Sequence, residues 1–329
     1  MTDRRRTFGH TCVALLSIAV VLLTGMRGRA DAAPQPAAAI CGTGSSGSTG
    51  SLGSTGSAGS SGSRDLSGPG RTEVRSMTVG GLQRSYRIHF PGGYNGTAAV
   101  PLIVAFHGHA EQSRDFEQYS GLSRLPAIVL YPNGLRGTRG TTSWQGAPYS
   151  ARRADDLAFT RALVATTRAR ECVDPGRIYA VGRSNGGGFV GMLACRMPAM
   201  FAAYATVSAA FYLPAAANCP GAAPVSLIDF HGTSDAVIHY GGGVRFGARY
   251  LSVDAALHRW ITRAGCIPAP IAVPATLSTI RLDWPLCAAL GREVVHYRIA
   301  GGTHNWPNSP GFAAADKIWQ FFWLHPKGL

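Results

Sequence analysis

Short apolar runs alternate with helix-like segments from residue 72 to the end of the chain. The apolar runs predict strands at residues 72–79, 82–90, 102–106, 127–131, 177–181, 225–230 and 294–299. The segments between the later runs predict helices at 155–170, from Ser184 to Met197, at 252–263 and at 313–324. Fully apolar strands that alternate with helices are typical of a mostly parallel sheet that is covered on both faces. We therefore expect an α/β fold.

One of these strands runs directly into a Gly-x-Ser-x-Gly motif. The strand at 177–181 is followed by Gly182-Arg183-Ser184-Asn185-Gly186. Between a strand and a helix, this motif is typical of a nucleophile elbow, in which a sharp turn exposes the serine hydroxyl. The glycines fit, because the turn strains the nucleophile's backbone and leaves no room for side chains two residues away. The alternative is a turn without chemistry, since the chain contains 42 glycines.

Two later strands also end in residues that suit catalysis. A serine hydroxyl reacts only when a base takes its proton and a third group orients that base. Asp235 follows one predicted strand, and His304 follows the last one after a Gly-Gly turn. The order Ser184, Asp235, His304 is that of the nucleophile, acid and base of an α/β-hydrolase. Two other aspartates compete for the role of acid, Asp229 within its strand and Asp254 at a predicted helix start.

The tetrahedral intermediate of such a reaction needs two N–H donors for its oxyanion. We expect one from the backbone of Asn185, at the start of a helix whose dipole adds positive charge. The other is expected from the backbone of His109, in the loop after the strand at 102–106. His107 in the same loop is interpreted as a packed structural histidine. Trp144 and Trp306 are candidate aromatic walls for a substrate, although Trp144 is equally typical of a core.

The composition limits the partners. The formal net charge of +14 is nearly all arginine, and such a charge favours polyanions, acidic wall polymers or membrane surfaces. No basic run with interleaved aromatic residues appears in the body of the chain, so we interpret the charge as scattered and expect no nucleic-acid partner. No Cys-x-x-Cys or Cys/His cluster has zinc spacing, so no metal is expected.

The first 32 residues have the three parts of a secretory signal peptide. Arginines at 4–6 precede an apolar run from Cys12 to Met26, and Ala30-Asp31-Ala32 is a small-residue cleavage site. The run is shorter than the ~20 residues that span a bilayer. We expect export without stable membrane insertion after cleavage, with an uncleaved anchor as the alternative. Residues 33–70 are then an N-terminal segment and Gly/Ser-rich linker, and residues 71–329 the catalytic domain.

The cysteine count agrees with export. The six cysteines after the predicted cleavage site are Cys41, Cys172, Cys195, Cys219, Cys266 and Cys287. An even number in an exported chain predicts three disulfides, for which the count alone allows fifteen pairings.

Several segments together resemble a known family. They are His107-Gly108, Tyr131-Pro132-Asn133-Gly134, the elbow with the residues before it from Cys172, His231-Gly232-Thr233-Ser234-Asp235, and the segment from Gly301 to Pro307. The chain from about Thr72 onward resembles the exported feruloyl and acetylxylan esterases of carbohydrate esterase family one. The poly(3-hydroxybutyrate) depolymerase-like esterases are close relatives. The resemblance implies an α/β-hydrolase fold, no cofactor, and cleavage of carboxylic esters through an acyl-enzyme.

The resemblance also implies substrates and disulfide pairs. The expected substrate is a plant cell-wall ester such as feruloylated or acetylated xylan, and a hydroxyalkanoate polyester is the alternative. A second alternative is a non-catalytic, wall-associated binding protein on a hydrolase scaffold. The implied pairs are Cys41–Cys172, Cys195–Cys219 and Cys266–Cys287. The chain departs from many relatives at His109, where they have cysteine or glycine, and Arg183 places a cation beside the nucleophile. Secretion is expected, with cell-wall association as a further hypothesis, and the oligomeric state is not predicted.

Overall fold

A ten-stranded sheet organises the residues that the computed structural model describes, which are 41, 69–213, 215, 219 and 223–328. Its strands are β1 (Arg71–Val79), β2 (Leu82–Phe90), β3 (Val100–Phe106), β4 (Ile128–Pro132), β7 (Val173–Arg183), β8 (Ala203–Val207), β9 (Ser226–Gly232), β12 (Ile271–Pro274), β13 (Thr279–Trp284) and β14 (Val294–Ile299). Their order across the sheet is β1-β2-β4-β3-β7-β8-β9-β14-β13-β12. The central strands from β4 to β14 pair in parallel. An antiparallel hairpin forms each edge.

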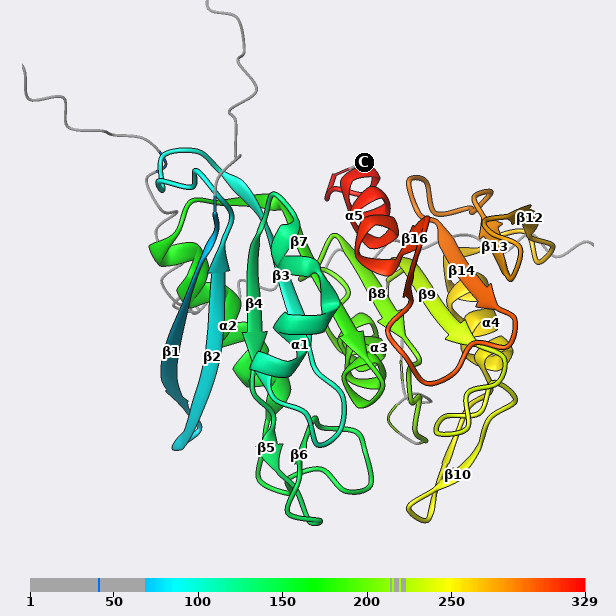
Figure 1. Cartoon of the computed structure of the whole chain (residues 1–329), viewed down its shortest axis with the longest axis horizontal. Helices are drawn as coiled ribbons and strands as arrows, with labels where there is room; N and C mark the ends of the chain where they lie inside the picture. The colour runs from blue at the N-terminus through cyan, green and yellow to red at the C-terminus, as the bar shows by residue number, and fades with distance from the viewer. Residues whose placement is uncertain (1–40, 42–68, 214, 216–218, 220–222, 329) are drawn as a thin grey trace, which may run out of the picture. The chain divides into compact units, whose positions relative to one another are not determined.

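Helices cover both faces of this sheet (Figure 1). They are α1 (Ser113–Ser120), α2 (Asp156–Arg170), α3 (Asn185–Arg196), α4 (Val253–Ala264) and α5 (Ala314–Leu324). Successive side chains of a strand point to opposite faces, so β3 contributes to two cores. Its Leu102 and Val104 pack in the core with α2, α3 and α4, whereas Ile103 and Ala105 pack in the core with α1 and α5. The predicted α/β class, with a mostly parallel sheet, is confirmed.

Three short hairpins lie outside the main sheet in the described part of the chain. They pair β5 (Leu135–Arg136) with β6 (Thr142–Ser143), β10 (Gly243–Arg245) with β11 (Ala248–Tyr250), and β15 (Asn308–Ser309) with β16 (Phe312–Ala313). The first two extend beyond the arrowheads of the central strands in Figure 1. They therefore lie beyond the carboxyl ends of the parallel strands, which is where such sheets bind ligands.

The structure contains several elements that the sequence analysis did not predict. Helix α1, strand β8 and the edge hairpin β12–β13 were not predicted, and β7 begins at Val173, before the predicted strand start at residue 177. β8 is rich in alanine, which is a weak strand former, and it is fully buried between β7 and β9. β12 is exposed at every position, so it shows no alternation of apolar and polar residues.

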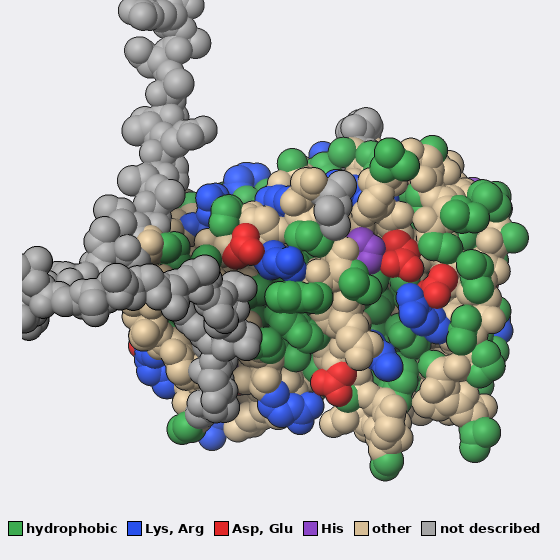
Figure 2. Space-filling view, turned by 90° about the horizontal axis from the view of Figure 1, so that it is seen from above, with side chains coloured by type: hydrophobic (Ala, Val, Ile, Leu, Met, Phe, Trp, Pro, Cys, Tyr) green, Lys and Arg blue, Asp and Glu red, His purple; other side chains and the backbone are tan. Residues whose placement is uncertain are grey.

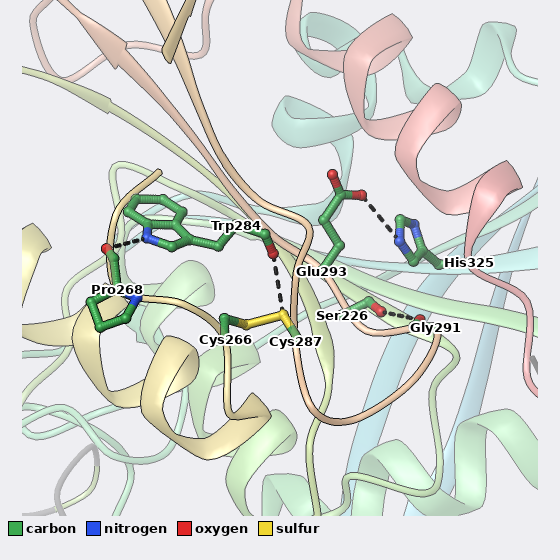
Figure 3. Close-up of a disulfide and its surroundings, with 8 residues drawn as sticks. All are labelled: Ser226, Cys266, Pro268, Trp284, Cys287, Gly291, Glu293 and His325. Carbon is green, nitrogen blue, oxygen red and sulfur yellow. Dashed lines mark hydrogen bonds and ion pairs between the residues drawn. A yellow bond between two sulfur atoms is a disulfide. The ribbon is translucent and has the colours of Figure 1, made fainter. Parts of the chain in front are cut away.

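Disulfides join the described cysteines in the pairs that the family resemblance implies, Cys41–Cys172, Cys195–Cys219 and Cys266–Cys287. Figure 3 shows the last of these, which ties the end of α4 to the loop after β13. The indole N–H of Trp284 in β13 donates to the carbonyl of Pro268 at 2.8 Å beside it. This edge of the sheet is therefore fixed by a covalent bond and a hydrogen bond.

The structure tests fewer of the expectations for the N-terminal segments and for the surface charge. The predicted signal peptide and most of the Gly/Ser-rich linker lie outside the described residues. No helix among the described residues is long and apolar enough to cross a membrane. On the face seen in Figure 2, which looks at the molecule from above Figure 1, basic and acidic side chains are interspersed among apolar and other residues. On this face, the mixture agrees with the scattered basic charge that the sequence predicts.

Candidate active site

Ser184 occupies a sharp turn between β7 and α3. Its backbone φ of 73° lies in the left-handed region, which is unfavourable for a residue with a side chain. A Cβ at Gly182 would meet the backbone carbonyl of Gly186, and one at Gly186 would meet the carbonyl of Phe106 in β3. Only glycine fits at either position, because the helix and the neighbouring strand approach so closely. The turn has the geometry that the sequence predicts for a nucleophile elbow.

His304 and Asp235 meet Ser184 at the carboxyl ends of three strands. His304 Nε2 lies 2.9 Å from Ser184 Oγ, and His304 Nδ1 lies 2.7 Å from Asp235 Oδ2. An ionised carboxylate only accepts hydrogen bonds, so this network assigns the imidazole proton to Nδ1 and leaves Nε2 to accept from the serine hydroxyl. The structure thus brings together the three residues that the sequence singles out, in an arrangement able to deprotonate Ser184.

Asp235 is buried and held from several sides. Its Oδ1 accepts hydrogen bonds from the N–H groups of Val237 and Ile238, each at 2.8 Å. His231 Nε2 lies 3.3 Å from its other oxygen. Burial alone raises the pKa of Asp235, but the hydrogen bonds from His231, His304 and the Ile238 N–H outweigh it and hold the pKa well below its usual range. The carboxylate is therefore ionised and fixed in one orientation.

The rival aspartates are engaged elsewhere. Asp229 lies within β9, where its carboxylate contacts His296 Nδ1 at 2.9 Å and accepts from the hydroxyl of Thr206 at 2.6 Å. Asp254 lies in the first turn of α4. Of the three candidates, only Asp235 contacts His304 in the described part of the chain.

The two predicted oxyanion donors remain predictions, supported by their surroundings. Asn185 is the first residue of α3, and the first N–H groups of a helix have no acceptor within it. The N–H of His109 has no acceptor among the described residues. The loop around His109 is held in place, because its ring nitrogen Nε2 lies 2.7 Å from Thr141 Oγ1 and the next N–H, of Ala110, donates to Thr142.

His107 is structural, as interpreted from the sequence. Its ring is fully buried, and burial lowers its pKa to about 4. Nε2 accepts a hydrogen bond from the Gly134 N–H at 3.0 Å, and Nδ1 lies 2.7 Å from the carbonyl of Gly108. A neutral ring with both nitrogens occupied fixes the loop that carries His109.

The expectation that Trp144 lines the substrate site is wrong. Its side chain is fully buried and stacks on Phe189 of α3, with ring centroids 5.6 Å apart. Its indole N–H donates to the carbonyl of His107 at 2.9 Å, and its backbone N–H donates to the side chain of Asn185 at 2.7 Å. Trp144 therefore supports the elbow and the His107 loop from the core side and offers no surface to a substrate.

Trp306 lies beside an open cleft of about 710 Å³. Its ring is mostly buried against Phe116 of α1, so only a small part of it is accessible. Residues next to the triad also line this cleft, among them Arg183, Gly302, Thr303 and Asn305. Ser184 and His304 are not among the lining residues, so the cleft flanks the triad. A role for Trp306 in substrate binding remains a prediction.

Arg183 links the loops on both sides of the nucleophile. Its guanidinium donates to the carboxylate of Glu111 and to the backbone carbonyl of His304. The other carboxylate oxygen of Glu111 accepts from the Gly108 N–H and from the Tyr119 hydroxyl, each at 2.8 Å. The residue before Ser184 thus joins the loop of the base to the loop of the predicted oxyanion donor. Sequence reasoning missed Glu111, because nothing in the sequence pairs it with a residue 72 positions away.

We expect Arg183→Gln and Glu111→Gln each to lower kcat by about tenfold with a smaller change in KM, because a small displacement of catalytic groups slows the chemical step. Because the two residues share an ion pair, the double variant should lose about as much activity as the more impaired single variant, and less than the product of the two single losses. Steady-state kinetics on 4-nitrophenyl acetate measure this. Arg75→Gln, which breaks a comparably buried pair with Glu171 between β1 and the end of α2, is the control and should keep its activity. Fully additive losses would argue against a shared role.

Comparisons with known proteins agree with this geometry. The family model described as esterase PHB depolymerase matches residues 84–255. The chain is 29% identical over 198 residues to feruloyl esterase B of Piromyces equi, a match that covers 57% of this chain but only 37% of that protein. It is 27% identical over 272 residues to feruloyl esterase C of Emericella nidulans, covering 78% of this chain and 91% of the relative.

A solved structure supports the fold class. The acetyl xylan esterase from Aspergillus awamori superposes with a TM-score of 0.55 at 15% sequence identity, covering 77% of this chain and 99% of that one. At this identity the similarity concerns the fold alone, and it confirms the α/β-hydrolase architecture.

Proposed function

Since this chain belongs to the esterase PHB depolymerase family, it is a carboxylic ester hydrolase, and we propose that it cleaves its esters through Ser184, His304 and Asp235. The observation that carries this proposal is the continuous hydrogen-bonded series from Ser184 Oγ through His304 to Asp235, with distances of 2.9 and 2.7 Å. A nucleophile, a base and an orienting carboxylate in contact are what acyl transfer by a serine requires.

The geometry supports a two-step reaction. His304 Nε2 takes the proton of Ser184 as Oγ attacks the ester carbonyl, and the N–H groups of Asn185 and His109 bind the oxyanion. Each donor lowers the barrier by ~3 kcal/mol. The imidazolium, stabilised by ionised Asp235, gives its proton to the departing alcohol and leaves an acyl-enzyme. A water molecule, deprotonated by His304, then attacks the acyl carbon, and Ser184 regains its proton as the acid departs.

The proposed substrate is a plant cell-wall ester, such as feruloylated or acetylated xylan. Relatives named feruloyl esterase B and feruloyl esterase C support this choice. The open cleft of about 710 Å³ beside the His304 loop leaves room for a polymer chain next to the ester. A polyester of hydroxy acids is the second candidate, favoured by the match to the esterase PHB depolymerase model. A complete triad argues against a purely binding role.

We also propose that the protein acts outside the cell. All six cysteines after residue 32 are joined in disulfides, which persist in oxidising compartments. The predicted signal peptide supports the same location. The arginine-rich composition is consistent with attachment to an acidic cell wall, which stays a hypothesis.

The substrate proposal is tested with three compounds side by side, namely methyl ferulate, acetylated xylan and oligomers of 3-hydroxybutyrate. Wild-type protein and Ser184→Ala are compared on each, with released acid measured by chromatography. Release of ferulate or acetate at the highest kcat/KM supports the wall-ester proposal. Preferential release of hydroxybutyrate would establish the polyester alternative, and no release from any compound would contradict ester hydrolysis on these substrates.

A further inference from the structure

Two arginines at the rim of the candidate site share one aromatic ring. Arg139, between β5 and β6, and Arg245, at the end of β10, hold their guanidinium carbons 4.6 and 4.8 Å from the ring centroid of Phe246. Within the described ranges, neither arginine forms an ion pair with a carboxylate. Two cations that share a ring repel each other, so an anion beside the ring that reaches both guanidinium groups is attracted by both.

The contacts of the two arginines place them beside the catalytic loops. The β5–β6 hairpin that carries Arg139 contacts the His109 loop, since Thr141 Oγ1 lies 2.7 Å from His109 Nε2. Arg245 Nη1 donates to the carbonyl of Val237 at 3.4 Å, and the N–H of Val237 donates to the carboxylate of Asp235. The two arginines therefore lie on segments that flank the loop of the predicted oxyanion donor and the loop of the acid.

The positive charge reaches the candidate site. Burial, followed by the charges of Arg245 and Arg139, lowers the pKa of the His109 ring. The exposed ring of Phe246 packs edge-on against Tyr149, with ring centroids 5.0 Å apart, and the ring centroid of Tyr149 lies 4.1 Å from that of His109. The rim thus presents an exposed aromatic ring and two guanidinium groups beside the His109 loop of the candidate site.

We propose that Arg139, Arg245 and Phe246 form a subsite for a carboxylate on the ester substrate. Guanidinium groups bind carboxylates through paired, charge-assisted hydrogen bonds, and the ring contacts the adjacent carbon chain. The inference rests on the proposed esterase function and narrows its substrates to esters that carry a negative charge. That charge lies either on the acyl part, as at the free end of an oligoester, or on the alcohol part, as in a polysaccharide that contains uronic acid.

Matched ester pairs test the subsite and distinguish these two sources. On the acyl side, 4-nitrophenyl hydrogen glutarate is compared with 4-nitrophenyl pentanoate. On the alcohol side, 4-acetoxybenzoate is compared with its methyl ester. At low ionic strength we expect kcat/KM for the charged member of at least one pair to exceed that of its neutral partner by about tenfold, and added salt should reduce the ratio.

The variant Arg139→Gln/Arg245→Gln should remove this preference while leaving kcat/KM for the neutral esters within about twofold of the wild-type value. The control is Arg168→Gln/Arg170→Gln, which removes the same charge from exposed positions at the end of α2. These positions lie next to the start of β7, at the end of the strands opposite to the candidate site. It should keep the preference. Loss of the preference in the control as well would assign the effect to net charge and overturn the subsite.

Failure of the subsite and failure of the esterase proposal give different results. Hydrolysis of the neutral esters with no charge preference in either pair would overturn the subsite and leave the esterase function intact. Absence of all hydrolysis would count against the esterase function. In that case, calorimetric binding of monomethyl glutarate to Ser184→Ala still tests the subsite, because binding should be about tenfold weaker when both arginines are also replaced. Equal binding would overturn the subsite.

Discussion

Replacing Ser184 by alanine should lower kcat for 4-nitrophenyl acetate by about 10⁴-fold or more, with the melting temperature nearly unchanged. Ser184 Oγ is the hydroxyl that contacts His304 Nε2 in the described structure, so its loss removes the nucleophile and leaves the base without a proton to take. The residual rate comes from the oxyanion donors and from substrate binding. Spectroscopic measurement of nitrophenolate release, beside a thermal melt of both proteins, gives the comparison.

A serine far from the site provides the control for this variant. Ser76 is exposed in the edge strand β1, so Ser76→Ala should hydrolyse the ester at the wild-type rate. If Ser184→Ala retained more than about a tenth of the wild-type kcat, Ser184 would not be the nucleophile, because single losses from a serine triad are far larger.

Replacing Asp235 by asparagine should lower kcat by about 10⁴-fold near neutral pH, the second of the two largest effects. An amide in this position can donate a hydrogen bond to His304 Nδ1, which then moves the imidazole proton to Nε2 and removes the acceptor for the serine hydroxyl. The N–H bonds from Val237 and Ile238 can persist to the amide oxygen, so the fold should be kept. Asp254→Asn, an exposed change in the first turn of α4, is the matched control and should keep full activity.

The pH profile gives an independent check of the same pair. The pKa of Asp235 is held well below its usual range, so its carboxylate stays ionised where a histidine base titrates. As the pH falls, wild-type kcat/KM should therefore decrease with the slope of one proton, because the reaction needs one unprotonated base and Asp235 adds no second titration in that range. A slope of two protons, or full activity in Asp235→Asn, would contradict these roles.

The proposed catalytic residues could be predicted because each one closely follows the end of its strand. β7 ends at Arg183, and β9 and β14 end within five residues of Asp235 and His304, so alternating apolar runs and glycine turns mark all three positions. Parallel strands bring their carboxyl ends to the same side of the sheet, so Ser184 and His304 can meet although 120 residues separate them along the chain.

Features that depend on tertiary packing could not be predicted in this way. Trp144 directly follows the short hairpin β5–β6, and the sequence around it does not show that its ring packs in the core against Phe189. The contact of Arg183 with Glu111 and that of Arg139 with Phe246 join residues from separate loops, whose relative positions no local pattern determines. In each case the sequence shows the residue type, and the fold determines its partner.

Labelling with the organophosphate diethyl 4-nitrophenyl phosphate tests the central claim most directly. Attack by an activated serine displaces nitrophenolate and leaves a stable diethylphosphoryl group on that residue. The proposed mechanism predicts one adduct per molecule, located at Ser184 by peptide mass mapping, with esterase activity lost in parallel and labelling greatly slowed in His304→Gln. An adduct on a different residue, or full esterase activity in protein labelled at Ser184, would contradict it.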